Sequence, residues 1–237
     1  MIAPTVHLQL RRSDVQELIS AIGRTDRRAA GEASAALERG DVDTVLDTPA
    51  AAEAVRGNGG APAPVSALLL WYVPVRAELL ARHESNIRVA DFTATLPLVF
   101  MRAKHRTAPF TDTYISDWMR VVESLPRDTT GRAEAASRSA ARALWWAGCF
   151  PAHLEDRYGS GARRAFLTFA ATMLHEAGRI IATKAADLSE LYGQVAGEVD
   201  LLSDALQAVS ADYIGKDAHT VSGRLERYLA RMRETAA

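Results

Sequence analysis

The sequence predicts an all-α fold, an irregular multi-helix bundle with mostly antiparallel neighbours and two Pro-kinked central helices. Three observations support this prediction. Helix caps and helix stops recur along the whole chain. Residues 64–83 are apolar on almost every side, which is typical of a buried helix. Apolar residues near the C-terminus repeat in heptads, as they do along the seam of a helix bundle. Beyond residue 12, no segment alternates in the way that a β-sheet requires.

The N-terminal part is expected to be an arm followed by a helical cap, over residues 1–56. Val6, Leu8 and Leu10 alternate with polar residues, which indicates an extended arm that docks on the body or on a second subunit. A frayed first turn of helix is the other interpretation. Capping residues and glycine stops predict the cap helices, over residues 13–23, 25–39, 41–47 and 49–56.

A Gly/Pro-rich stretch over residues 57–64 predicts a flexible linker, because Pro forbids helix before it and Gly supplies freedom. Residues 65–237 would then form the main helical bundle, although the whole chain could also be one domain. Its helices are expected over residues 64–83, 87–105, 111–125, 129–149, 161–186, 188–214 and 217–234, with a short turn of helix after Pro151.

Two consecutive helices of the main bundle carry an internal proline. Pro74 and Pro97 each remove a backbone donor and clash with the carbonyl four residues earlier, which predicts a kink in both helices. A bent hairpin of this kind can open a pocket between its helices. We favour the simpler interpretation, in which the bend wraps around a core.

Arg76 is the most informative charge in the chain. It falls on the same helical face as Leu69 and Tyr72, and a charge on such a stripe cannot stay buried without a partner. Asp91 and Glu176 are the expected carboxylates. The charge either grips an acidic ligand or forms an internal ion pair. The candidate ligand-binding residues are Arg76, Tyr72, Asp91, Arg138 and Trp145.

The heptad seam runs over more than three heptads near the C-terminus. Small residues such as Ser203 and Ala196 flank it, whereas an exposed dimeric coil usually carries opposed charges there. We therefore expect a core helix, with a homodimer through the seam as the second interpretation. Gly193 and Gly197 would add a small-residue patch. The seam residues are Leu188, Tyr192, Val195, Val199, Leu202, Leu206, Val209 and Tyr213.

His175, Glu176 and Arg179 are the candidate catalytic residues. The string His175-Glu176-x-x-Arg179 matches the zinc protease helix motif only in its first two letters, and Arg179 stands where a second histidine would be needed. We therefore expect no metal site and no cofactor. The same helix carries a polar stripe that could line a wet cleft, with His175 as acid or base and Arg179 as anion binder. Cys149 is expected to be a buried, unreactive thiol.

Composition excludes several functional classes. The chain has 237 residues, 48% of them hydrophobic, and a net charge of −1, so it is neither disordered nor a strong electrostatic partner for nucleic acid. A single cysteine and the absence of a basic start with an apolar run predict a cytoplasmic protein. The longest apolar run is about half of what spans a bilayer.

The sequence therefore predicts a helical bundle that acts by binding a protein partner or a small ligand, and that could form a homo-oligomer. The alternative is a small-molecule enzyme or cofactor-binding protein with a cleft near His175, Arg179 and Arg76. Contact with nucleic acid through three arginines of the last helix is the least favoured interpretation, because so few cations make a weak patch.

Overall fold

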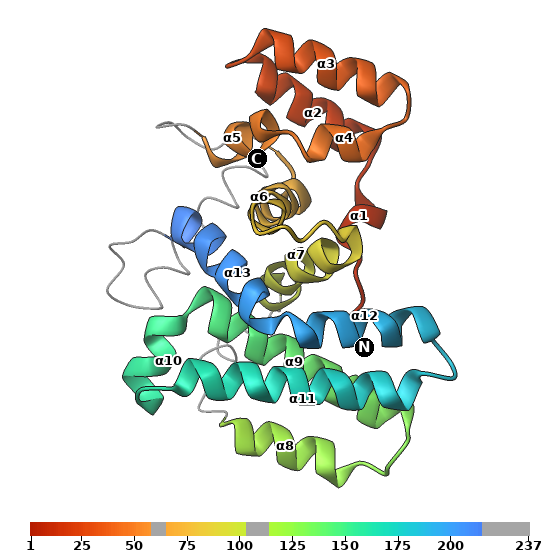
Figure 1. Cartoon of the computed structure of the whole chain (residues 1–237), viewed down its shortest axis with the longest axis vertical. Coiled ribbons are helices and arrows are strands. Elements are labelled where there is room, and N and C mark those ends of the chain that lie inside the picture. The colour runs from red at the N-terminus through yellow and green to blue at the C-terminus, as the bar shows by residue number, and fades with distance from the viewer. Residues whose placement is uncertain (58–64, 103–113, 215–237) are drawn as a thin grey trace. The chain divides into compact units, whose positions relative to one another are not determined.

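The computed structural model describes residues 1–57, 65–102 and 114–214. This part of the chain forms thirteen α-helices and no strand, which confirms the predicted all-α fold (Figure 1). The contacts divide the chain into two compact units. The N-terminal unit holds residues 5–95 and the described residues from 208 onward, and the C-terminal unit holds residues 1–4 and 96–207. The fold of each unit is described separately.

Three helices of the N-terminal unit begin directly after a polar side chain that caps them. Asp26, Asp41 and Thr48 each accept a hydrogen bond from a backbone N–H in the first turn of α3, α4 and α5, which satisfies a donor that the helix itself leaves open. The helices are α1 (Val6–Gln9), α2 (Arg12–Gly23), α3 (Arg27–Glu38), α4 (Val42–Leu46), α5 (Pro49–Arg56), α6 (Ala67–Ala81) and the first part of α7 (Ile87–Arg102).

The start of the chain does not form the extended arm that its alternating residues indicate. Residues 6–9 are a single short turn of helix, α1, which ends before α2 begins. Val6 is fully buried, whereas Leu8 is 84% exposed. A helical turn separates residues two apart by about 200°, so Val6 and Leu8 face opposite ways and the prediction of one apolar side is wrong.

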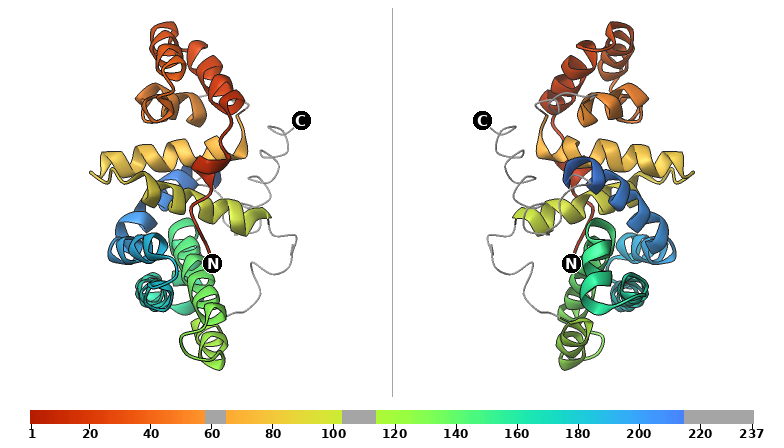
Figure 2. Two further views of the ribbon diagram at one scale, coloured as in Figure 1. Left: turned by 90° about the vertical axis from the view of Figure 1, so that its right-hand side faces the viewer. Right: turned by 90° about the vertical axis from the view of Figure 1, so that its left-hand side faces the viewer.

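Helix α6 forms the centre of the N-terminal unit. It is apolar all round, with Leu69, Trp71, Val73 and Val75 buried, and α5 packs alongside it (Figures 1 and 2). Pro74 lies inside α6 and Pro97 inside α7, as the sequence predicts. The predicted linker separates α5 from α6 in the sequence, yet both helices belong to the same unit because α6 needs apolar partners on every side.

The C-terminal unit is built on two long helices that lie side by side, α9 and α11, with α12 against α11 (Figure 1). Alanine fills the α9 face, so the helix backbones can approach closely; Ala133, Ala136 and Ala140 are fully buried. Besides the end of α7, the helices are α8 (Ile115–Ser124), α9 (Thr130–Cys149), α10 (Pro151–Tyr158), α11 (Ala162–Ile181), α12 (Ala186–Gly197) and α13 (Val199–Ile214), whose last residues belong to the N-terminal unit.

The close helix contacts of this unit lie at two glycines. A methyl group on Gly148 would stand 2.6 Å from Cβ of Leu206, and one on Gly178 would stand 3.3 Å from the Ser189 carbonyl oxygen. Gly148 is therefore a packing position in the last turn of α9, which ends at Cys149. Gly193 and Gly197, the expected small-residue patch, are exposed and have open space around them.

The heptad seam is a core feature, although two helices carry it instead of one. Helix α12 ends at Gly197 and α13 begins at Val199, with Glu198 between them. The seam residues Tyr192, Val195, Leu202 and Leu206 are all fully buried. The chain itself therefore covers these residues, and the homodimer through the seam stays a prediction.

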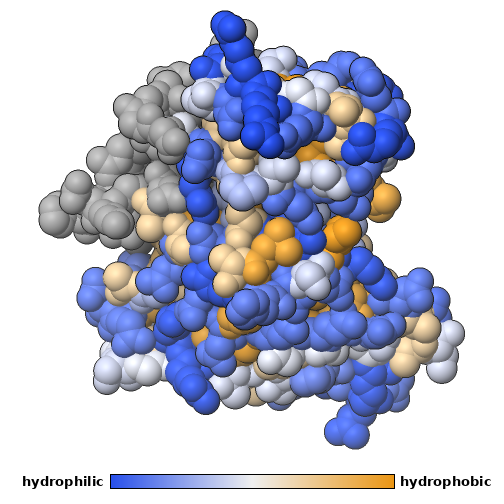
Figure 3. Space-filling model, turned by 45° about the horizontal axis from the view of Figure 1, so that its top comes forward, coloured by the Kyte–Doolittle hydropathy of each residue, from blue (hydrophilic) through white to orange (hydrophobic). Residues whose placement is uncertain are grey.

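The face drawn in Figure 3 is mostly hydrophilic, with apolar residues in small groups between the charged ones, as is usual for a folded chain. Among the described residues, no helix combines the length and apolarity needed to cross a membrane. The linker residues 58–64 and the helix predicted over residues 217–234 lie outside the described part of the chain.

Candidate functional site

Arg76 is buried as predicted, with 3% of the residue exposed. Its Nε and Nη2 atoms donate to the two carboxylate oxygens of Asp47, each at 2.8 Å, and its Nη1 donates to the Ser85 carbonyl at 2.8 Å. The hydrogen bond to Asp47 is the main reason that the pKa of Arg76 is raised. The fork of the guanidinium, which would grip an acidic ligand, is thus occupied by the protein itself.

The partner of Arg76 is neither Asp91 nor Glu176, the two carboxylates expected from the sequence. Asp47 ends α4 within the cap, and the packing of the cap against α6 brings it to Arg76. Asp91 serves another purpose: its carboxylate accepts the backbone N–H of Val6 at 2.7 Å. Burial is the main cause that raises the pKa of Asp91.

Tyr72 lies in the same polar cluster of the N-terminal unit. Its ring is 5.9 Å from the ring of His7, and His7 in turn bonds Asp43 at 2.8 Å. Burial raises the pKa of the Tyr72 hydroxyl. Together with the hydrogen bond from Val6 to Asp91, these contacts join α1, α4, α6 and α7. The cluster therefore holds these helices together.

Arg138 and Trp145 do not share a site. Arg138 is exposed and 3.6 Å from Glu134, one turn earlier on the same helix. Trp145 is 1% exposed and stacks on Phe100, with 5.3 Å between the ring centroids. Elsewhere on α9, the guanidinium carbon of Arg142 lies over the Trp118 ring, 5.2 Å from its centroid.

His175, Glu176 and Arg179 lie on or beside the exposed face of α11. The Glu176 carboxylate accepts hydrogen bonds from Arg132 at 3.0 Å and from Arg179 at 3.2 Å. These hydrogen bonds lower the pKa of Glu176, and the bond from Arg179 has the larger effect. Arg179 also pairs with Asp128 at 2.9 Å. The polar stripe of α11 is exposed along its length, which is typical of a solvated face. Its members are Thr168, Thr172, His175 and Arg179, and Thr183 is exposed in the turn after α11, which ends at Ile181.

Two further groups with metal-binding or nucleophilic chemistry lie in the C-terminal unit, one buried and one half-buried. Cys149 is buried, and burial raises the pKa of its thiol far above the ordinary value, which disfavours the thiolate needed for nucleophilic attack. His153 stacks on Trp146 at 5.6 Å, and burial lowers its pKa. The described residues hold no cluster of three or more groups suited to a metal ion.

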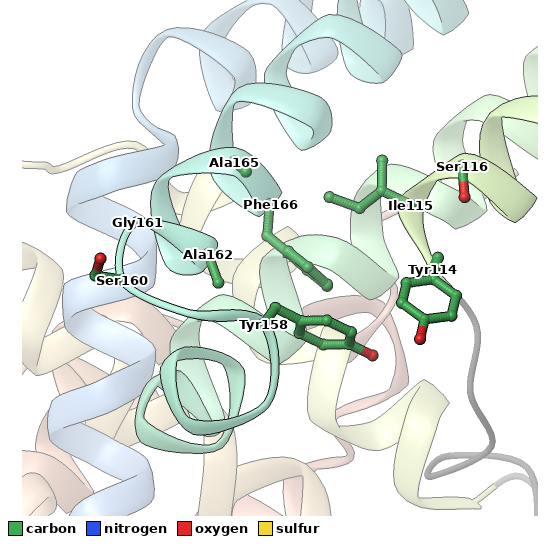
Figure 4. A pocket seen from close by; sticks show the side chains of 9 residues that line it. All are labelled: Tyr114, Ile115, Ser116, Tyr158, Ser160, Gly161, Ala162, Ala165 and Phe166. Atoms are coloured by element: carbon green, nitrogen blue, oxygen red, sulfur yellow. The ribbon is translucent and has the colours of Figure 1, made fainter.

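A pocket of about 400 Å³ lies in the C-terminal unit, where α8 begins, α10 ends and α11 begins (Figure 4). Three aromatic rings and several small side chains form its walls. No lining residue carries a carboxylate, an amine, an imidazole or a thiol. The lining residues are Tyr114, Ile115, Ser116, Tyr158, Ser160, Gly161, Ala162, Ala165 and Phe166.

The local sequence explains why the chain opens here. Gly159 and Gly161 have φ of 89° and 88°, a left-handed conformation that glycine adopts without strain. They turn the chain sharply from α10 into α11. The Glu155 carboxylate accepts the backbone N–H groups of Gly161 and Arg163 at 3.0 and 3.3 Å, so it caps α11 and fixes the turn.

The aromatic rings of the pocket meet at steep or tilted angles. The Tyr114 and Tyr158 rings lie 5.7 Å apart at 68°, and the Tyr158 and Phe166 rings 5.9 Å apart at 34°. Phe166 also meets the edge of Trp118 at 5.8 Å. The indole N–H of Trp118 is buried and has no hydrogen-bond partner in the described part of the chain. Each ring therefore contacts the next, and together they form an uncharged wall.

Sequence reasoning did not identify this pocket. Its residues come from three helices, and single aromatic residues at helix ends look like ordinary core or surface positions. The available signal was the Gly159-Ser160-Gly161 turn, placed between Tyr158 and the start of a long helix. Comparison of the chain with protein-family models, curated proteins and solved structures gives no significant match.

Proposed function

We propose that this protein is a non-catalytic binding protein whose C-terminal unit holds a small molecule in the aromatic pocket between α8, α10 and α11. The pocket itself is the observation that carries the proposal. Its volume of about 400 Å³ falls within the range of about 300–1,000 Å³ that small-molecule sites occupy. Its mixture of rings, small side chains and hydroxyls is also typical of such sites.

Binding without catalysis is favoured by the chemistry of the lining. Acid–base or nucleophilic catalysis needs a titratable group close to the reacting atoms, and none of the nine lining residues supplies one near neutral pH. The groups expected to do chemistry are engaged elsewhere: Arg76 with Asp47 in one unit, and Arg179 with Glu176 and Asp128 in the other. No contact of these residues favours the enzyme alternative.

We place this activity in the cytoplasm. The single cysteine of the chain, Cys149, is buried as a free thiol, which suits a reducing compartment. A protein partner and a homo-oligomer stay predictions.

Native mass spectrometry of the chain purified from its own host tests the proposal. Ala165 lines the pocket from the exposed side of α11, so Ala165→Trp should fill the space with little strain on the core. Thr172→Trp is the matched control, because Thr172 is exposed two turns further along the same helix and does not line the pocket.

The wild-type chain and the Thr172→Trp variant should both carry a bound small molecule, whereas Ala165→Trp should lose it. Circular dichroism of both variants verifies that the helices are intact. The absence of any bound mass, or a bound mass that survives Ala165→Trp, would contradict the proposal.

A further inference from the structure

We infer that the occupant of the aromatic pocket is an uncharged planar compound of one or two rings, with a polar edge. This inference rests on the proposed function and adds the chemical class of the ligand.

The shape of the lining favours a flat ring. Tyr158 and Phe166 are tilted by only 34° to one another, whereas Tyr114 meets Tyr158 at 68°. A planar guest could therefore stack on one ring and meet another edge-on, which are the two arrangements that aromatic pairs prefer. The small residues Gly161, Ala162 and Ala165 leave room on the α11 side (Figure 4).

The charges near the pocket argue against an anionic guest. The lining supplies no cation. The backbone N–H groups of Gly161 and Arg163 at the start of α11, which could bind an anion, already donate to the Glu155 carboxylate. A guest with a negative charge would lose hydration without gaining a counter-ion, which is unfavourable.

A cationic guest is disfavoured for a different reason. Aromatic rings attract cations through their faces, so a ring-lined pocket could in principle hold one. Here the guanidinium of Arg157 already lies over the Tyr158 ring, 5.7 Å from its centroid. That ring is therefore already in contact with a cation of the protein, and a cationic guest would find no carboxylate among the lining residues.

The hydroxyl groups of the pocket supply hydrogen bonds for a polar edge. The hydroxyls of Tyr114 and Tyr158 belong to lining side chains (Figure 4). Neither forms a hydrogen bond to another group in the described ranges, so each is available both as donor and as acceptor. Ser116 and Ser160 add two more hydroxyl-bearing residues.

Three probes that share one ring system but differ in charge test this inference. Indole is uncharged, indole-3-acetate is an anion and tryptamine is a cation at neutral pH. The dissociation constant of each is measured by proton NMR titration against the full chain. Indole should bind about tenfold more tightly than either charged probe, which corresponds to about 1.4 kcal/mol.

Variants of the pocket separate this inference from the proposed function. Ala165→Trp should abolish indole binding and Thr172→Trp should leave it unchanged. Tyr158→Phe keeps the ring and removes only the hydroxyl, so it should weaken indole binding less than Tyr158→Leu, which removes the ring. Dispersed amide spectra verify that each variant is folded.

If a charged probe binds as tightly as indole, and Ala165→Trp abolishes its binding, the pocket is a ligand site but its ligand class is not the one inferred. If no probe binds although native mass spectrometry finds a bound mass that Ala165→Trp removes, the inferred ligand class is wrong and the proposed function stands. If Ala165→Trp leaves both the bound mass and indole binding unchanged, the proposed function is overturned as well.

Discussion

The two compact units use their chemically active side chains in opposite ways. The N-terminal unit buries charged groups and satisfies them internally: Arg76 with Asp47, and Asp91 with the backbone of α1. In the C-terminal unit the candidate residue Arg179 pairs with Asp128 at the surface, and an uncharged, ring-lined pocket lies open.

A conspicuous buried charge can therefore be a weaker indicator of function than an uncharged pocket. A buried ion must be paired to be tolerated, so Arg76 is fully explained by the fold that surrounds it. The three aromatic rings that line the pocket need no ion-pair partner, and they border an open space. The less conspicuous residues are therefore the better candidates for binding.

The largest loss of stability is expected when the internal ion pair of the N-terminal unit is broken. Arg76→Ala leaves Asp47 and the Ser85 carbonyl without their donor, so the free energy of unfolding should fall by about 3 kcal/mol. Urea denaturation measures it. Arg28→Ala is the matched control, because the Arg28–Glu32 pair is exposed and exposed pairs contribute little to stability. Equal losses in the two variants would show that burial does not distinguish Arg76.

The next effect concerns the packing of the C-terminal unit. Gly148→Ala places a methyl group 2.6 Å from Cβ of Leu206, so the overpacked helices should lose about 1–3 kcal/mol. Gly193→Ala adds the same methyl group where nothing lies within 4 Å and should stabilise the chain by up to about 1 kcal/mol. Thermal unfolding compares the two. A gain of stability in Gly148→Ala would refute the close approach of α9 and α13.

The smallest effect is a pH dependence in the N-terminal unit. Burial raises the pKa of Asp91 above 3.8, so the folded chain holds this proton more tightly than the unfolded chain. The protonated Asp91 carboxyl therefore contributes its full stabilisation below pH 3.8, and this contribution is lost as the pH rises through the folded-state pKa. Asn cannot ionise, so the stability of Asp91→Asn relative to wild type should increase from acidic to neutral pH.

Urea midpoints at several pH values measure this trend. Asp14→Asn serves as the control, since Asp14 caps α2 at the surface. A relative stability of Asp91→Asn that decreases toward neutral pH would mean that the hydrogen bond from Val6 outweighs burial.

Local patterns predicted the helices well because caps and periodicity act within a few residues. The starts of α3, α4 and α5 follow from Asp26, Asp41 and Thr48, and the burial of Arg76 follows from its helical face. The partner of Arg76, the break at Glu198 and the tight contact of Gly148 depend on which helices pack together. Periodicity along one helix carries no such information.

The pocket illustrates the same limit. It forms where the ends of three helices meet, and no single stretch of sequence contains its walls. Tyr158 and Gly161 lie close in the sequence, but Tyr114 reaches them only through the tertiary fold. A site built from uncharged side chains also lacks the charge pattern that directs attention to residues such as His175.

An amide NMR titration of the full chain with indole tests the comparison between the units most directly. Backbone amide shifts should change around residues 114–116 and 158–166, and should stay unchanged around Asp47 and Arg76. Shifts confined to the Asp47–Arg76 cluster, or an absence of shifts at the pocket, would show that the aromatic pocket is not the binding site.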